Sequence, residues 1–138
     1  MTHATTAPDR WALVFGLAAL GNLGIGLWML ADPAGWYHAT PGVPGSGPLN
    51  EHFVRDVGAT FTTLGLALVW GLRRPDLRLP MLALVTCFHA AHALVHVLDT
   101  ARGLFPAGQW SIDAPLIYLP TALLLLALGM LGRQAARA

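Results

Sequence analysis

Two runs of ionisable side chains interrupt otherwise apolar stretches of the sequence. The first, at residues 50–56, reads Asn-Glu-His-Phe-Val-Arg-Asp, and the second, at residues 89–99, carries histidines followed by an aspartate. Ionisable residues inside membrane-spanning segments are costly and rare, so each one is a candidate functional residue. The two runs therefore indicate a site built from imidazole, carboxylate and guanidinium groups.

The spacing within each run places its polar side chains on one face of a helix. In the second run the polar residues fall within an arc of roughly 80° of the helix; they are His89, His92, His96 and Asp99. In the first run, His52 and Asp56 are one turn apart, with Arg55 on the adjoining edge. If the two faces meet, their side chains form one cluster.

Such a cluster predicts a transition-metal site. The expected metal ligands are His52, Asp56, His89, His92 and His96. Imidazole and carboxylate suit zinc, iron or copper, and helical bundles build metal sites from inward side chains on facing helices. In an enzyme, Asp56 or Glu51 would be the catalytic proton acceptor for a metal-bound water. Alternatively, two histidines on facing helices would ligate a haem b axially.

Arg55 and Asp99 are expected to support the cofactor rather than to ligate it. Arg55 would hold an anion, and Asp99 would orient His96 through its other ring nitrogen. Asp99 also lies near a helix C-terminus, where an anion opposes the helix dipole, so we expect Arg55 or Arg102 beside it.

Two other interpretations of the cluster stay open. The polar side chains could hydrogen-bond across the helices and fix their packing, as in a non-catalytic accessory or scaffold subunit of a larger membrane complex. They could also hold the carbonyl or phosphate oxygens of a quinone or a lipid. Both runs are expected to lie at the same depth in the membrane, as the orientation described below indicates. This favours a ligand-binding or proton-handling site with a redox-linked role.

The elements that must position these residues follow from composition. The chain has 138 residues, of which 55% are hydrophobic and 11% charged, whereas soluble domains carry about 25% charged residues. Residues 11–30, 53–72, 81–98 and 116–131 are each apolar and long enough to cross a ~30 Å hydrocarbon core. We therefore predict an all-α fold: an antiparallel four-helix transmembrane bundle forming one integral membrane domain over residues 1–138. A net charge of +1 excludes a broad basic surface for nucleic acid.

The arginines predict the orientation of this bundle. They concentrate at the two ends of the chain and between residues 72 and 81, which places both termini in the cytoplasm. The composition, rich in alanine, leucine and arginine and free of lysine, indicates a bacterial inner membrane. Both ionisable runs then lie in the outer half of the bilayer. The glycine- and alanine-rich faces of residues 11–30 would also allow a homo-oligomer.

Residues 48–58, Pro-Leu-Asn-Glu-His-Phe-Val-Arg-Asp-Val-Gly, and the later His-x-x-His-x-x-x-His-x-x-Asp pattern resemble small bacterial four-span membrane proteins of the DoxX-like group. The resemblance covers about Trp11 to Asp99. DoxX is associated with thiosulfate:quinone oxidoreduction, so the resemblance implies a quinone-linked redox role. The histidine run belongs to no DoxX motif, and the resemblance assigns no residue roles.

Overall fold

The structure is a computed structural model that describes residues 9–106 and 108–137, and these residues are helical apart from short connections. The long helices are α1 (Arg10–Ala31), α3 (Glu51–Arg73), α4 (Arg78–Ala101) and α6 (Leu119–Ala135). The short elements are α2 (Pro33–Ala39), η1 (Val43–Gly45), η2 (Pro75–Leu77), α5 (Gln109–Asp113) and the π-helical turn η3 (Ala114–Tyr118). The predicted all-α class is confirmed.

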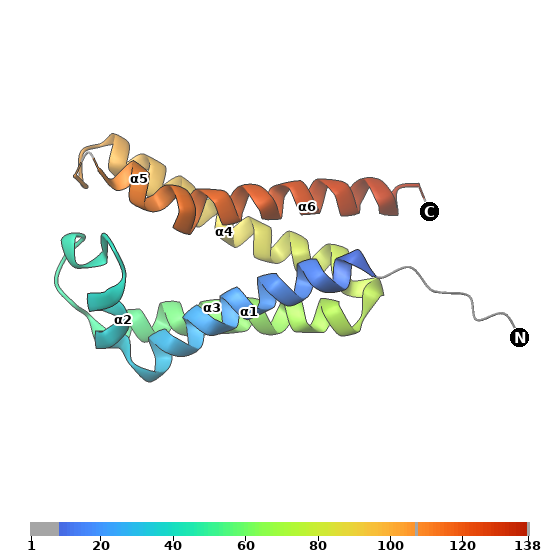
Figure 1. The fold of residues 1–138 in the computed structure, drawn as a ribbon, viewed down its shortest axis with the longest axis horizontal. Coiled ribbons are helices and arrows are strands. Elements are labelled where there is room, and N and C mark those ends of the chain that lie inside the picture. Colours follow the sequence, from blue (N-terminus) through green and yellow to red (C-terminus); the bar gives the residue numbers. More distant parts are fainter. Residues whose placement is uncertain (1–8, 107, 138) are drawn as a thin grey trace, which may run out of the picture.

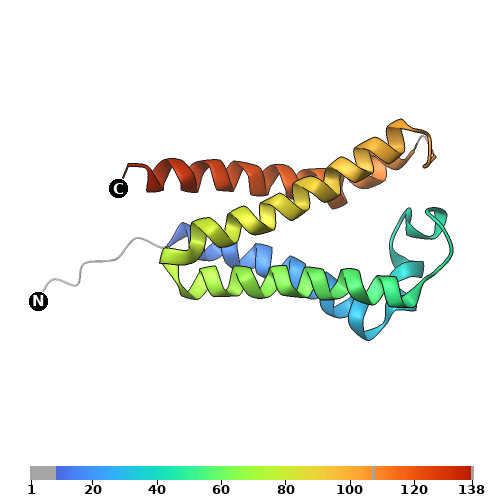
Figure 2. The same cartoon turned by 180° about the vertical axis from the view of Figure 1, so that it is seen from behind.

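The helices form two hairpins that diverge along the molecule. In the first hairpin α1 packs against α3, and α2 and η1 lie at its bend; in the second α4 packs against α6, and α5 and η3 lie at its bend (Figure 1). The hairpins meet where α3 passes through η2 into α4, and they separate toward α2 and α5 (Figures 1 and 2). The molecule thus has a terminal end, where α1 begins and α6 ends, and a bend end.

Glycines allow the helices of the first hairpin to approach closely. A β-carbon at Gly26 would lie 2.6 Å from the backbone nitrogen of Thr62, and one at Gly58 would lie 2.7 Å from the β-carbon of Met29. Neither clash can be relieved by turning a flexible side chain, so both positions require glycine for this packing. Gly21 and Gly24 face open space, and the homo-oligomer remains a prediction.

Within the described residues, three helical segments are long and apolar enough to cross a membrane: Arg10–Ala31, Pro75–Ala101 and Gln109–Ala135. They support the prediction of a membrane protein. The fourth predicted span, residues 53–72, lies in α3 and is not confirmed, because Arg55, Asp56 and several threonines lower the hydropathy of that helix. Neither the four-span bundle nor its orientation in a membrane is therefore established.

The helix ends agree with local sequence signals except before α6. The side chain of Asn50 accepts a hydrogen bond of 3.1 Å from the backbone N–H of Phe53, as an N-cap should. The last predicted span starts earlier than expected, because helix begins at Gln109 and continues through η3. Pro120 has no N–H for a helical bond, and the widened turn of η3 directly precedes it. Asp113 consequently lies inside a helix and not at its cap.

Candidate functional site

A cavity of about 1200 Å³ lies between the two hairpins. All of the long helices contribute to its lining, together with α2, the loop that follows it, and α5. Most of the lining is apolar, and its larger side chains include Ile25, Met29, Phe61, Phe88, Phe105 and Leu124. The cavity is large enough for a drug-sized or larger ligand.

The strongest polar feature of the cavity is a buried carboxylate paired with a histidine. Asp113 is 2% exposed. Nδ1 of His96 lies 3.0 Å from Oδ2 of Asp113, and Nε2 of Gln109 donates to Oδ1 at 2.8 Å. Since a carboxylate only accepts, Nδ1 of His96 carries the hydrogen, and Nε2 is left as a lone-pair acceptor. The pair can accept a proton at His96 while Asp113 stabilises the resulting cation.

A second polar contact crosses the cavity between the hairpins. Nε2 of His89 lies 3.2 Å from Oδ1 of Asn22, whose amide nitrogen donates to the carbonyl of Ala18 at 2.9 Å. Because Oδ1 can only accept, Nε2 of His89 is the donor. This bond joins α4 to α1 in the middle of the molecule and orients the His89 ring.

His92 lies between these two contacts and makes no hydrogen bond to any residue that the structure describes. Its ring stacks on Phe88, with planes 6° apart and centroids 5.9 Å apart, and its centroid is 4.8 Å from that of His96. The His96 ring is in turn nearly parallel to Phe105, at 14°. All four of these aromatic rings line the cavity, and neither nitrogen of His92 is engaged by another described residue.

The first ionisable run does not join this cluster. His52 and Asp56 have side chains 87% and 65% exposed, and they contact each other at 3.5 Å. They lie on the side of α3 opposite Val54 and Phe61, which are buried and line the cavity. The expectation that His52 and Asp56 face His92 and His96 is therefore wrong. The pattern shows which residues share a helix face, but not which face packs inward.

The remaining members of the first run pair with each other. Nη2 of Arg55 lies 2.7 Å from Oε2 of Glu51, one turn away, and both side chains are about half exposed. Neither residue lines the cavity. The ion pair satisfies Arg55 locally, which explains why it is not beside Asp99 as predicted.

Asp99 lines the cavity, but it does not orient His96; Asp113 has that position. No arginine within the described residues forms an ion pair with Asp99, so the expected neutralisation by Arg55 or Arg102 is not found. Nor do the described residues contain a group of three or more His, Cys, Asp or Glu side chains arranged to hold a metal ion. The five-ligand cluster predicted from spacing does not assemble.

Three residues of the site are absent from the predicted ligand set: Asn22, Gln109 and Asp113. Asn22 is a polar residue within an apolar helix, which is itself a signal. Asp113 lies near the start of the last helical segment and His96 near the end of α4, so an antiparallel arrangement places both at the same depth.

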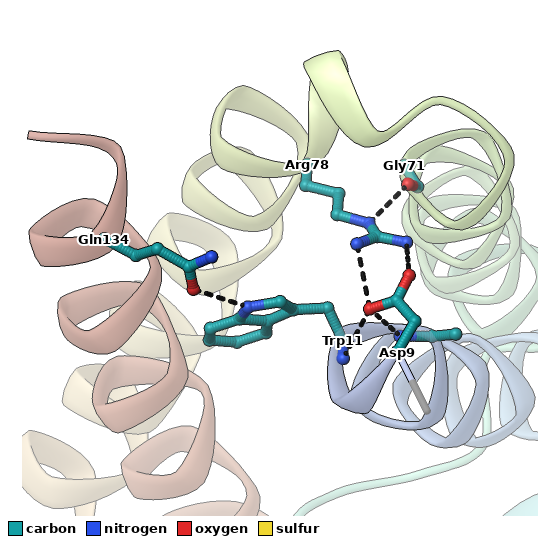
Figure 3. A network of polar contacts seen from close by, with 6 residues as sticks. Asp9, Trp11, Gly71, Arg78 and Gln134 are labelled. Atoms are coloured by element: carbon teal, nitrogen blue, oxygen red, sulfur yellow. Dashed lines mark hydrogen bonds and ion pairs between the residues drawn. The ribbon is translucent and has the colours of Figure 1, made fainter. Parts of the chain in front are cut away.

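A different polar network ties the helices together at the terminal end (Figure 3). Nη1 and Nη2 of Arg78, on α4, donate to the carboxylate of Asp9 at 3.2 and 2.6 Å, and Nε donates to the carbonyl of Gly71 at 3.3 Å. The indole N–H of Trp11 donates to Oε1 of Gln134 on α6 at 2.9 Å. These bonds connect α1, α3, α4 and α6.

The guanidinium of Arg78 changes the acidity of Asp9. Hydrogen bonding from Arg78, together with its positive charge and the backbone N–H groups at the start of α1, holds the pKa of Asp9 below its usual value. Arg78 itself is only 8% exposed. Its sequence position suggests a topology determinant, but the structure shows that it is a buried cross-link.

Fold and site together define a class: an all-helical protein with apolar helices suited to a membrane and a large cavity lined by histidines. The model of the family described as a domain of unknown function, DUF4345, matches residues 10–126, and the chain belongs to that family. This match does not confirm the DoxX-like resemblance. No curated protein and no solved structure matches the chain.

Proposed function

We propose that the protein binds a lipid-soluble molecule with carbonyl or hydroxyl oxygens, of the quinone class, in the cavity between its hairpins. The observation that carries this proposal is the His96–Asp113 pair in a mostly apolar cavity of about 1200 Å³. Ligand sites are typically apolar clefts in which a few polar groups set orientation. An isoprenoid quinone has that chemistry, with a planar oxygen-bearing head and an apolar tail.

Hydrogen-bonding groups are available for such a head group. Among the described residues, the ring nitrogens of His92 have no hydrogen-bond partner, and His96 bonds to Asp113 through Nδ1 alone, which leaves Nε2 without one. Nε2 of His96 can accept a hydrogen bond from a ligand hydroxyl, and the single N–H of a neutral His92 ring can donate to a carbonyl. The indole nitrogen of Trp36, a further lining residue, is buried without a partner among the described residues.

Aromatic packing supports a planar ligand. The nearly parallel pairs Phe88–His92 and His96–Phe105 provide flat surfaces on which a ring can stack. Apolar side chains of α1 and α6, such as Leu17 and Leu123, are largely exposed and also line the cavity. A ligand tail could therefore extend between these helices into the membrane.

The proposal is tested with purified full-length protein and a short-chain ubiquinone analogue, following intrinsic tryptophan fluorescence during titration. We expect Asp113→Asn to weaken binding by about ten- to hundredfold, since hydrogen bonds that involve a charged group contribute about 1.5–3 kcal/mol. His52→Gln removes an exposed histidine and is the matched control. Equal affinity of wild type and Asp113→Asn would contradict the proposal.

A metal ion is a second candidate, favoured by one specific observation. Carboxylates commonly orient metal-binding histidines through the other ring nitrogen, and Asp113 does this for His96. His92, one turn away, could supply a second nitrogen; water or the bound molecule would complete the coordination. Metal analysis and an absorption spectrum of the purified protein distinguish the cases, because a Soret band indicates haem and bound zinc, iron or copper without one indicates a simple site.

The scaffold interpretation makes a different prediction for the same variants. If the histidines serve only to hold helices together, Asp113→Asn and His96→Gln should lower the thermal stability without changing the binding of any small molecule. Co-purification with a larger membrane complex and an empty cavity would favour that interpretation.

A further inference from the structure

The terminal end carries a second pocket, separate from the histidine cluster. It has a volume of about 530 Å³, and its lining consists of Arg10, Met130, Arg133, Gln134 and Arg137. Arg10 is the first residue of α1, Arg133 lies in the last turn of α6 and Arg137 in the turn that follows it, so only the folded chain brings the three together. We propose that this pocket binds the phosphate of an anionic membrane phospholipid.

The charge of the pocket favours an anionic ligand. Within residues 9–106 and 108–137, no carboxylate lines the pocket and none forms an ion pair with these three arginines. Asp9 is adjacent in sequence to Arg10, but its carboxylate is occupied by Arg78 and by the backbone N–H of Trp11. The pocket is therefore a concentration of positive charge without a counter-ion from the described chain, and guanidinium groups suit phosphate oxygens.

The positions of the three arginines at the helix ends also favour a bound anion. Arg133 in the last turn of α6 and Arg137 in the turn after it line the same pocket, where their like charges repel. Arg10 lies at the N-terminus of α1, where the helix dipole already favours an anion and disfavours a cation. A bound phosphate relieves both repulsions. The alternative, that α6 simply ends in cations because its dipole favours them, explains Arg133 and Arg137 but not Arg10.

Neighbouring apolar surface identifies the source of the phosphate. Arg10 and Met130 line both this pocket and the larger cavity, so the two spaces adjoin. From there Leu17 on α1 and Leu126 on α6 continue the lining, and both are more than half exposed. An acyl chain attached to the phosphate would lie along this seam, whereas a free phosphate would leave it bare. The pocket thus fits a lipid with a negatively charged head group.

The arginine pocket adjoins the hydrogen bonds that join α1 to α6, so a bound lipid can affect the stability of the protein. Oε1 of Gln134 accepts from Trp11 at 2.9 Å and from Nη2 of Arg10 at 3.3 Å, and the guanidinium of Arg10 lies over the Trp11 ring. A lipid held by Arg10 and Arg133 would bridge the same helices, α1 and α6. Bound lipid should therefore raise the unfolding temperature as well as occupy the pocket.

The test titrates dioleoylphosphatidylglycerol into the detergent-solubilised full-length protein and follows complexes by native mass spectrometry. We expect Arg133→Gln to weaken binding about fivefold, and the double variant with Arg137→Gln about thirtyfold. Arg73→Gln, which removes an equal charge from the exposed end of α3, should change affinity less than twofold. Thermal unfolding of each variant without lipid verifies that it is folded.

Two further arms decide the identity of the ligand. Dioleoylphosphatidylcholine, whose head group has no net charge, should bind at least tenfold more weakly, and millimolar inorganic phosphate should not displace the anionic lipid. Equal effects of Arg73→Gln and Arg133→Gln would overturn the proposal, as would equal binding of the two lipids. Displacement by inorganic phosphate would overturn the lipid assignment in favour of a free anion.

Discussion

The terminal end and the bend end of this protein both contain polar side chains but use them differently. At the terminal end, Arg78, Asp9, Trp11 and Gln134 bond to one another and to the backbone, and they connect all four long helices. Toward the bend end the hairpins separate around a cavity, and His92 and Nε2 of His96 have no protein partner among the described residues.

The difference between the two ends follows from how their polar groups are satisfied. A polar group that lines a mostly apolar cavity without a protein partner needs water or a ligand to satisfy it, because an unpaired polar group is costly. The terminal network satisfies its donors and acceptors and stabilises the fold. The histidines of the cavity leave hydrogen-bonding capacity free, which is what a binding site requires.

The largest expected effect on stability concerns the first hairpin, where α1 and α3 touch between the two ends. Gly26→Ala would place a β-carbon 2.6 Å from the backbone nitrogen of Thr62 and should destabilise the protein by about 1–3 kcal/mol. Gly24→Ala, two residues away in open space, should be neutral or slightly stabilising. Denaturant unfolding in detergent measures both; equal effects would show that α1 and α3 do not pack as described.

The second-largest effect on stability is expected when the terminal network is broken. Arg78→Met removes the bonds to Asp9 and Gly71 and should cost about 1–2 kcal/mol, a value reduced because the side chain of Asp9 is 49% exposed. Arg73→Met, at the exposed end of α3, should cost less than about 0.5 kcal/mol. If the two variants unfold alike, Arg78 is only a topology determinant and the contrast between the ends disappears.

A smaller effect is expected at the contact between α1 and α6. Trp11→Phe keeps most of the buried ring but removes the indole N–H that donates to Gln134, and it should cost about 0.5–1.5 kcal/mol. Trp28→Phe, on the exposed side of α1, is the control. Trp11→Phe should leave ligand affinity at the cavity unchanged, because the hydrogen bond that it removes lies at the terminal end.

The smallest effect is a dependence of stability on acidity. Arg78 lowers the pKa of folded Asp9 below its usual 3.8, so the ionised carboxylate stabilises the fold. This contribution is complete above pH 3.8 and is lost as the pH falls through the lower pKa of the folded state. Thermal unfolding between pH 5 and 2 should show this loss in the wild type, and Asp9→Asn should reduce it. An unchanged slope in Asp9→Asn would refute the role of that carboxylate.

Much of the helical architecture can be predicted from sequence because apolar runs and helix-capping residues are local features. Residues 11–30 and 81–98 fall inside α1 and α4, and Asn50 caps α3 as expected. Length alone does not make α3 a membrane span, because its polar residues lower its hydropathy, and it is not among the three apolar segments of the described residues.

The site is predictable only in part, because helix spacing does not specify rotation or partners. His89, His92 and His96 share the face that lines the cavity, as their spacing predicts. His52 and Asp56 share a face as well, but that face is exposed. The partners of His89 and His96 are Asn22 and Asp113, which come from α1 and from the helix after the last bend; only tertiary packing reveals such pairs.

The most direct test of the proposed quinone site is to locate the head group of a bound quinone. A quinone analogue with a photoreactive azide on its ring would be cross-linked to the full-length protein in lipid nanodiscs, and the labelled peptides would be identified by mass spectrometry. If the quinone head group binds at the histidine cluster, the label should be found around His92, His96 and Phe105. It should be lost in Asp113→Asn and retained in His52→Gln. Labelling that is confined to the terminal end, or that is equal in wild type and Asp113→Asn, would contradict it.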